Sequence, residues 1–166
     1  TLSHQFQYRK DNTTPAICHP RNVVNYLKRL GVRDQDVLCG GWLHDVIEDC
    51  NVRLDYIEKG FNPKVSRIVE KLTKNVGMSR EEYKNVIKNS GYDVQIIKLA
   101  DVTDNCSNLR APYLPKDSVM RFVNDCSTLY LSMAQRISPQ LYSVLSDEID
   151  GVHGFSKTDW ENYHSI

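Results

Sequence analysis

The stretch from His44 to Asp49 combines residues that can bind a metal ion with residues that can move a proton. His44 and Asp45 are adjacent, and Glu48 and Asp49 follow one helical turn later. Asp45, Glu48 and Asp49 follow i, i+3, i+4 spacing, so they are expected to share a helix face. Three carboxylates on one face repel one another, so the cluster requires a positive charge, which a metal ion can supply.

Two residues outside this stretch complete a possible ligand set. His19 lies upstream, directly before a proline, and Asp101 lies in the apolar run 96–102. A carboxylate buried in such a run is costly unless it is paired, hydrogen-bonded or bound to metal. The plainer alternatives to metal binding are that His19 is only hydrogen-bonded and that Asp101 forms a salt bridge at the core edge. Two imidazoles and two carboxylates can hold one divalent cation, the kind of site that phosphate-ester hydrolysis requires.

Helical spacing of apolar residues runs through nearly the whole chain, and no segment alternates as a strand does. The fold class is therefore predicted to be all-α. Gly40 and Gly41 lie inside one expected helix, where a close helix contact or a ligand would explain them. The expected helices span 20–30, 34–47, 54–59, 63–72, 79–87, 93–105, 118–137 and 140–149, with a buried strand as the less favoured alternative for 93–105.

Length and composition indicate a single domain. The 166 residues are predicted to form one domain over 1–150, with a polar tail over 151–166 that is at most partly ordered. The 21 basic and 21 acidic residues balance, which does not favour a nucleic-acid or anionic-membrane partner. No apolar run is long enough to span a bilayer, and the N-terminal residues do not form a signal peptide. Five cysteines without a Cys-x-x-Cys pattern indicate free thiols in a reducing cytoplasm.

Several ordered motifs, taken together, resemble the HD-domain phosphohydrolases, and more narrowly the hydrolase domain of the RelA/SpoT family and its small stand-alone alarmone hydrolases. The resemblance covers roughly residues 5–136. The motifs are Arg9-Lys10, Thr14-Pro15, His19-Pro20, LHDVIED (43–49), Ile57-Glu58, Phe61, VSRIVEKLTK (65–74) and IKLADVTDN (97–105).

The resemblance implies a single-domain helical bundle of the HD type that removes pyrophosphate from the 3′ position of guanosine tetra- or pentaphosphate (ppGpp). It implies a divalent cation, usually manganese, and an acidic pair, Glu48 and Asp49, that handles the attacking water. The implied metal ligands are His19, His44, Asp45 and Asp101, and the implied nucleotide contacts are Arg9, Lys10 and Asn105.

The chain departs from the family pattern on the nucleotide side. Relatives often carry Arg-Leu-His after the last metal-binding aspartate, whereas this chain has Val102-Thr103-Asp104. Asp104 is expected to be a solvated helix residue, with a hydrogen bond to a ligand or substrate as the alternative. Two functional alternatives stay open, namely another nucleotide substrate (NADPH or a deoxynucleotide) and a non-catalytic nucleotide sensor. In each case the partner is a small nucleotide, and the sequence does not give the oligomeric state.

Overall fold

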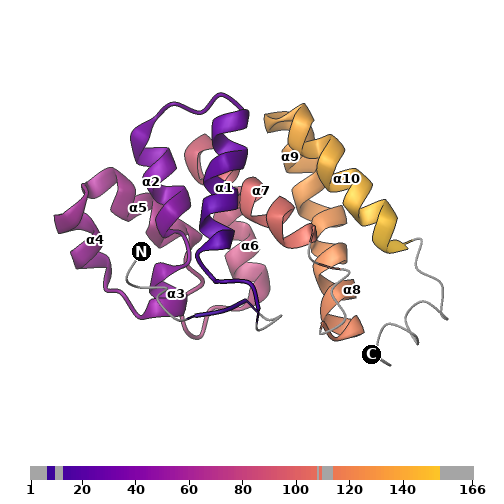
Figure 1. Ribbon diagram of the computed structural model, residues 1–166, viewed down its shortest axis with the longest axis horizontal. Helices are drawn as coiled ribbons and strands as arrows, with labels where there is room; N and C mark the ends of the chain where they lie inside the picture. The colour runs from indigo at the N-terminus through magenta and orange to yellow at the C-terminus, as the bar shows by residue number, and fades with distance from the viewer. Residues whose placement is uncertain (1–6, 10–12, 108, 110–113, 154–166) are drawn as a thin grey trace.

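The computed structural model describes residues 7–9, 13–107, 109 and 114–153, and within these ranges the chain is helical (Figure 1). The described residues form no strand, only an isolated antiparallel bridge between Tyr8 and Pro15. The predicted all-α class is therefore confirmed. The helices are α1 (Cys18–Arg29), α2 (Gln35–Leu43), α3 (Val46–Cys50), α4 (Leu54–Gly60), α5 (Pro63–Leu72), α6 (Arg80–Lys88), α7 (Tyr92–Cys106), α8 (Lys116–Asp125), the π-helix η2 (Cys126–Tyr130), α9 (Leu131–Ile137) and α10 (Pro139–His153).

Helix α7 is the central element of the bundle. It contacts α1, α2, α5 and α6 on one side and α9, α10 and the π-helix on the other (Figure 1). Apolar residues on nearly all of its faces are fully buried, among them Ile96, Ile97, Leu99 and Ala100. A helix that is apolar all round belongs in a core. The polar residues that α7 carries are therefore held inside the protein, next to whatever the neighbouring helices present.

The two glycines of α2 permit close helix packing. A Cβ atom at Gly40 would lie 2.6 Å from Cγ2 of Ile68 on α5, and one at Gly41 would lie 2.9 Å from Cδ1 of Leu27 on α1. Both distances are too short for a real side chain. A close helix contact, rather than a ligand, thus accounts for both glycines.

The predicted helix over 34–47 is interrupted, so this part of the prediction was wrong. Helix α2 ends at Leu43, α3 begins at Val46, and Asp45 caps α3 with φ −104° and ψ −3°. At the break, Nδ1 of His44 donates to the Gly41 carbonyl oxygen at 2.9 Å. This hydrogen bond ties the buried imidazole ring to the end of α2. Asp45 takes the N-cap position of α3, and its carbonyl oxygen accepts from the backbone amide of Asp49 at 2.8 Å.

The C-terminal part differs from the expectation in one detail. The predicted helix over 118–137 is continuous, but its middle turn is the π-helix η2. Helix α10 extends to His153, so the first residues of the predicted tail are helical, while 154–166 lie outside the described residues. The boundary at 150 stays a prediction. None of the helices in the described part of the chain has the length and apolar character needed to cross a membrane.

Candidate active site

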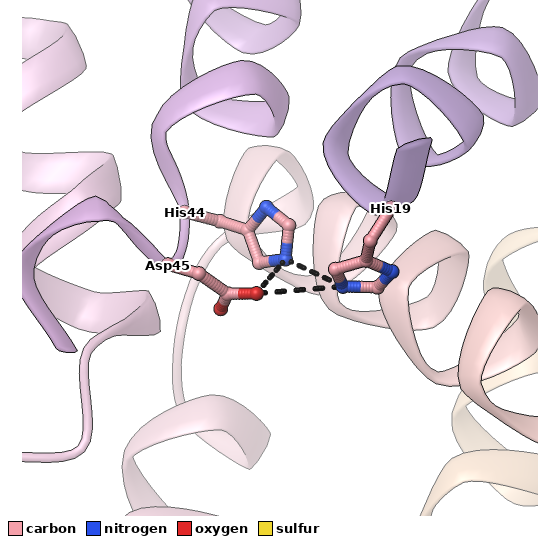
Figure 2. Close-up of side chains that lie close together, drawn as sticks. All are labelled: His19, His44 and Asp45. Carbon is pink, nitrogen blue, oxygen red and sulfur yellow. Dashed lines mark hydrogen bonds and ion pairs between the residues drawn. The ribbon is translucent and has the colours of Figure 1, made fainter. Parts of the chain in front are cut away.

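Four side chains from three parts of the chain converge beside α7. His19 comes from the start of α1, His44 and Asp45 from the break between α2 and α3, and Asp101 from α7. Nε2 of His19 lies 3.1 Å from Nε2 of His44 and 3.0 Å from Oδ1 of Asp101. Oδ2 of Asp45 lies 2.9 Å from Nε2 of His44 and 3.4 Å from Nε2 of His19 (Figure 2). All four residues predicted as metal ligands are thus brought together.

The hydrogen bonds behind the two rings determine which nitrogen faces the cluster with a lone pair. Nδ1 of His44 donates to a carbonyl oxygen, and Nδ1 of His19 lies 2.6 Å from a carboxylate oxygen of Asp104. A carbonyl and a carboxylate only accept, so a proton on Nδ1 of each ring satisfies them and leaves Nε2 available to a metal ion. Both Nε2 atoms then direct lone pairs at each other and at two carboxylate oxygens. Such a set of acceptors requires a cation, and its nitrogen and oxygen donors fit a divalent metal ion.

The electrostatics of the cluster also favour positive charge. Burial lowers the pKa of His19, but hydrogen bonds to Asp101, Asp104 and Asp45 outweigh it and raise this pKa to about 11. Burial likewise opposes the charged form of His44, yet the charge of Asp45 and the hydrogen bond to Asp101 raise its pKa to about 9. The imidazoles in turn hold the pKa of Asp45 well below its usual range, against the effect of burial. In the metal-free protein, protons take the place of the cation.

Asp101 is buried and held by two further residues of its own helix. Its Oδ2 accepts from Nζ of Lys98 at 2.7 Å, and its Oδ1 accepts from Nδ2 of Asn105 at 2.7 Å. The Lys98 ammonium also lies 5.2 Å from the centre of the Tyr83 ring. The salt bridge considered as an alternative is therefore present, but it uses one carboxylate oxygen and leaves the other facing the imidazoles.

Asp104 is only 3% exposed, so the expectation of a solvated helix residue was wrong. Its carboxylate accepts from Nδ1 of His19, from Nη1 of Arg9 at 2.8 Å and from Nδ2 of Asn22 at 2.9 Å. These three hydrogen bonds outweigh burial and lower its pKa. The reason for the error is that α7 is surrounded on all sides, which the sequence of α7 does not reveal for its polar positions.

The two predicted catalytic acids, both exposed, occupy different surroundings. Asp49 lines the cavity next to the cluster, together with Asp45. Glu48 accepts a hydrogen bond at its Oε1 from the backbone amide of Lys74, which follows α5, at 2.7 Å. Asp45 and Asp49 therefore line one cavity, whereas the carboxylate of Glu48 is bound to the backbone that follows α5.

A cavity of about 790 Å³ opens beside the cluster and is lined by His19 and Asp45 at one end. Arg9 and Asn105 also line it, and Nη2 of Arg9 donates to Oδ1 of Asn105 at 3.2 Å. Lys10, the third predicted nucleotide contact, lies outside the described residues. The remaining lining residues include Tyr8, Asp49, Arg80, Leu109, Leu114, Ser118, Val119, Arg121 and Phe122.

Sequence reasoning missed the two cationic residues Arg80 and Arg121. They lie on α6 and α8, outside the matching motifs, and both line the cavity. Arg80 forms an ion pair with Asp125, the last residue of α8. The only available signal was their positive charge next to expected helix starts, and many solvent-exposed arginines share that feature.

The fold and the site together are those of a helical protein with a His/Asp cluster, suited to bind a metal ion, beside a cavity of mixed polar and apolar lining. A profile of the HD domain matches residues 1–138, and the chain belongs to this family. The predicted resemblance is thereby confirmed, and membership of the family implies a divalent metal ion, which the His/Asp cluster is suited to bind.

Several relatives bear the name guanosine-3′,5′-bis(diphosphate) 3′-pyrophosphohydrolase. The protein from Borreliella burgdorferi is 30% identical over 93% of this chain and 24% of its own length. MESH1 of Drosophila melanogaster is 35% identical over 66% of this chain and 64% of its own length. The chain thus spans less than two thirds of either relative. A solved structure described as a metazoan ortholog of SpoT that hydrolyzes ppGpp superposes with a TM-score of 0.79 and 26% identity, covering 92% of this chain and 90% of that one.

Proposed function

We propose that this protein is a metal-dependent hydrolase that removes pyrophosphate from the 3′ position of guanosine tetra- or pentaphosphate. The observation that carries the proposal is the convergence of four possible metal-binding atoms beside a cavity that His19 and Asp45 line together with arginines. A metal ion held by these residues would supply an activating positive charge, and arginines match the several phosphates of such a nucleotide. The names of the relatives support the same substrate.

The proposed metal ligands are His19, His44, Asp45 and Asp101, and the proposed metal is Mn²⁺. Two imidazoles with two carboxylates suit a hard divalent cation that accepts both nitrogen and oxygen donors. When bound, the metal would make water more acidic and neutralise phosphoryl charge.

The protein's cationic side chains would bind the phosphates. Arg9 is anchored on α7 through Asp104 and Asn105, so its guanidinium is oriented before the nucleotide arrives. Lys10 is proposed to assist it. Arg80 and Arg121 line the same cavity from α6 and α8 and would contact the phosphates more remote from the metal.

In the proposed reaction, a water oxygen attacks the phosphorus atom attached to the ribose 3′ oxygen. The bond between this phosphorus and the 3′ oxygen breaks, pyrophosphate leaves, and the 3′ oxygen takes up a proton. Glu48, oriented by the Lys74 amide, is proposed to accept the proton of the water. Asp49, at the cavity wall, is proposed to orient the water by a hydrogen bond.

A cytoplasmic location fits this function. The five cysteines are free thiols, as in proteins of a reducing compartment. The proposed partner is a small nucleotide.

The direct test is turnover by the chelator-treated protein after addition of single divalent cations. Guanosine tetraphosphate should yield GDP and pyrophosphate, identified by ion-exchange chromatography and ³¹P NMR, with Mn²⁺ the best activator. Parallel reactions contain NADPH or a deoxynucleoside triphosphate. Faster phosphate release from one of these compounds would identify that nucleotide, and not guanosine tetraphosphate, as the substrate. Tight binding of guanosine tetraphosphate without any product in Mn²⁺ would instead indicate a sensor.

A further inference from the structure

The buried carboxylate of Asp104 connects the metal cluster to the nucleotide cavity. Its Oδ2 lies 2.6 Å from Nδ1 of His19 and also accepts from Nη1 of Arg9 at 2.8 Å. Its Oδ1 accepts from Nδ2 of Asn22 at 2.9 Å. One side chain thus holds a proposed metal ligand and a proposed phosphate-binding residue through the same oxygen atom.

The position of Asp104 on α7 explains how it can act on His19. Asp101 and Asp104 are three residues apart, so they lie on one face of the helix. Oδ1 of Asp101 approaches Nε2 of His19 at 3.0 Å, while Asp104 approaches Nδ1 of the same ring. Helix α7 therefore contacts both nitrogens of one imidazole, which fixes the rotation of the ring as well as its proton.

A carboxylate behind a metal-binding imidazole has a defined chemical effect. It keeps the ring proton on the nitrogen remote from the metal and makes the other nitrogen a stronger donor. An ionised carboxylate is expensive to bury, and an apolar residue would pack at this point of α7 without that cost. The presence of a charged carboxylate at this buried position is therefore best explained by the groups that Asp104 orients.

We propose that Asp104 is a positioning residue that directs Nε2 of His19 at the metal ion and holds Arg9 at the cavity wall. The inference rests on the proposed function, since it takes the metal and nucleotide sites from there. It adds that the two sites share one anchor, so that loss of Asp104 weakens both metal binding and nucleotide binding.

The first test measures Mn²⁺ binding by calorimetry in the absence of nucleotide. We expect Asp104→Ala to weaken Mn²⁺ binding by about 10- to 100-fold, and Asp104→Asn, which keeps the shape and one acceptor oxygen, by less. Asp93→Asn removes the same charge from the first turn of α7, where the carboxylate faces Lys64, and should leave the affinity unchanged. Wild-type affinity in both Asp104 variants would overturn the proposal.

A second measurement separates positioning from a merely structural role. Ring ¹⁵N spectra of the Zn²⁺-loaded protein should show His19 protonated at Nδ1, and the Nδ1 resonance should shift in Asp104→Asn, because a neutral amide replaces the carboxylate as its acceptor. Unchanged ring signals would overturn the proposal. Arg9→Ala removes the guanidinium that Asp104 holds but leaves the contact between Asp104 and His19 intact. It should therefore raise KM for the nucleotide, while the Kd for Mn²⁺ stays within about threefold of the wild-type value. The loss of Mn²⁺ affinity expected for Asp104→Ala is about 10- to 100-fold.

These measurements distinguish the inference from the proposed function. If the wild type binds Mn²⁺ but hydrolyses no guanosine tetraphosphate, the substrate assignment fails, while the effect of Asp104 on metal binding is still decided by the calorimetry. A wild type that binds neither Mn²⁺ nor Zn²⁺ would overturn both.

Discussion

His19 and His44 face each other through their Nε2 atoms, which lie 3.1 Å apart although 25 residues separate the two histidines in the chain. Each ring is held from behind, one by a carbonyl oxygen and the other by a carboxylate. Two neutral imidazoles in this arrangement would point lone pairs at each other. The pair is therefore a place for a cation, either a metal ion or the protons that replace it.

Removal of the Asp101 side chain should abolish metal binding and turnover together. Asp101→Ala takes away one proposed ligand and leaves the largely buried Lys98 ammonium without its carboxylate, so the free energy of unfolding should also fall by about 3 kcal/mol. Calorimetry with Mn²⁺ and thermal unfolding in EDTA measure the two effects separately. Asp101→Asn keeps the volume of the side chain and serves as the matched variant. Tight metal binding in both variants would remove Asp101 from the ligand set.

The two acids beside the cluster should differ in what they contribute. Glu48→Gln should retain Mn²⁺ affinity but lose most of kcat, by about 100-fold or more, because an amide cannot take the proton of the water. Asp49→Asn should lose less, because an amide can still hydrogen-bond water. Comparison of kcat for the two variants at equal metal saturation provides the measurement. A larger loss in Asp49→Asn would transfer the proton-accepting role to the residue that lines the cavity.

Arg121 should contribute to nucleotide binding and not to metal binding. Arg121→Gln removes a cation from the cavity wall, and loss of a charge-assisted hydrogen bond to phosphate should raise KM by about 10- to 100-fold. The Kd for Mn²⁺ in the absence of nucleotide should stay the same. Lys116→Gln, on the same helix but not lining the cavity, is the control for a change of charge. Equal KM values for the two variants would exclude Arg121 from the phosphate site.

The metal-free protein should lose stability at alkaline pH. The pKa of His44 is raised to about 9 and that of His19 to about 11, so these rings bind protons more tightly in the folded state than in the unfolded state. Their contribution is complete below pH 6.5, the ordinary value for histidine, and is lost as pH rises through 9 and then 11. Thermal unfolding in EDTA should therefore give a lower Tm at about pH 10 than at about pH 7. In a His44→Gln variant, Tm should fall less between these two pH values.

The same raised pKa values predict that metal binding displaces protons. At neutral pH the cluster holds charge as protons, and a divalent cation must expel them before the rings can bind it. Calorimetric titration with Mn²⁺ in two buffers of different ionisation enthalpy should report release of about one proton or more. Binding without proton release would mean that the imidazoles are neutral in the metal-free protein.

The close contact at Gly40 predicts a packing effect that is independent of the site. A Cβ atom there would meet Ile68 at 2.6 Å, so Gly40→Ala should lower the free energy of unfolding by about 1–3 kcal/mol through overpacking. Gly60 ends α4, and a Cβ atom added to it would have nothing within 4 Å, so Gly60→Ala should be neutral or slightly stabilising. Denaturant unfolding of the two variants would reveal the difference. Equal stabilities would mean that α2 and α5 can move apart at no cost.

The sequence by itself determined the helical class, most helix limits and the types of residue available to a metal ion. These properties depend on local spacing of apolar residues, on capping residues such as Asp34 and Ser79, and on the order of the motifs. They can be read from neighbouring residues because helix formation and capping are local interactions.

Only the tertiary structure decided how the site is completed. The break at His44 depends on a buried ring tied to the end of α2, and the burial of Asp104 depends on helices that surround α7 from distant parts of the chain. The approach of Arg80 and Arg121 to one cavity likewise depends on how α6 and α8 pack. Such contacts join residues far apart in the sequence, so no periodicity within one segment records them, and packing alone fixes which polar groups meet.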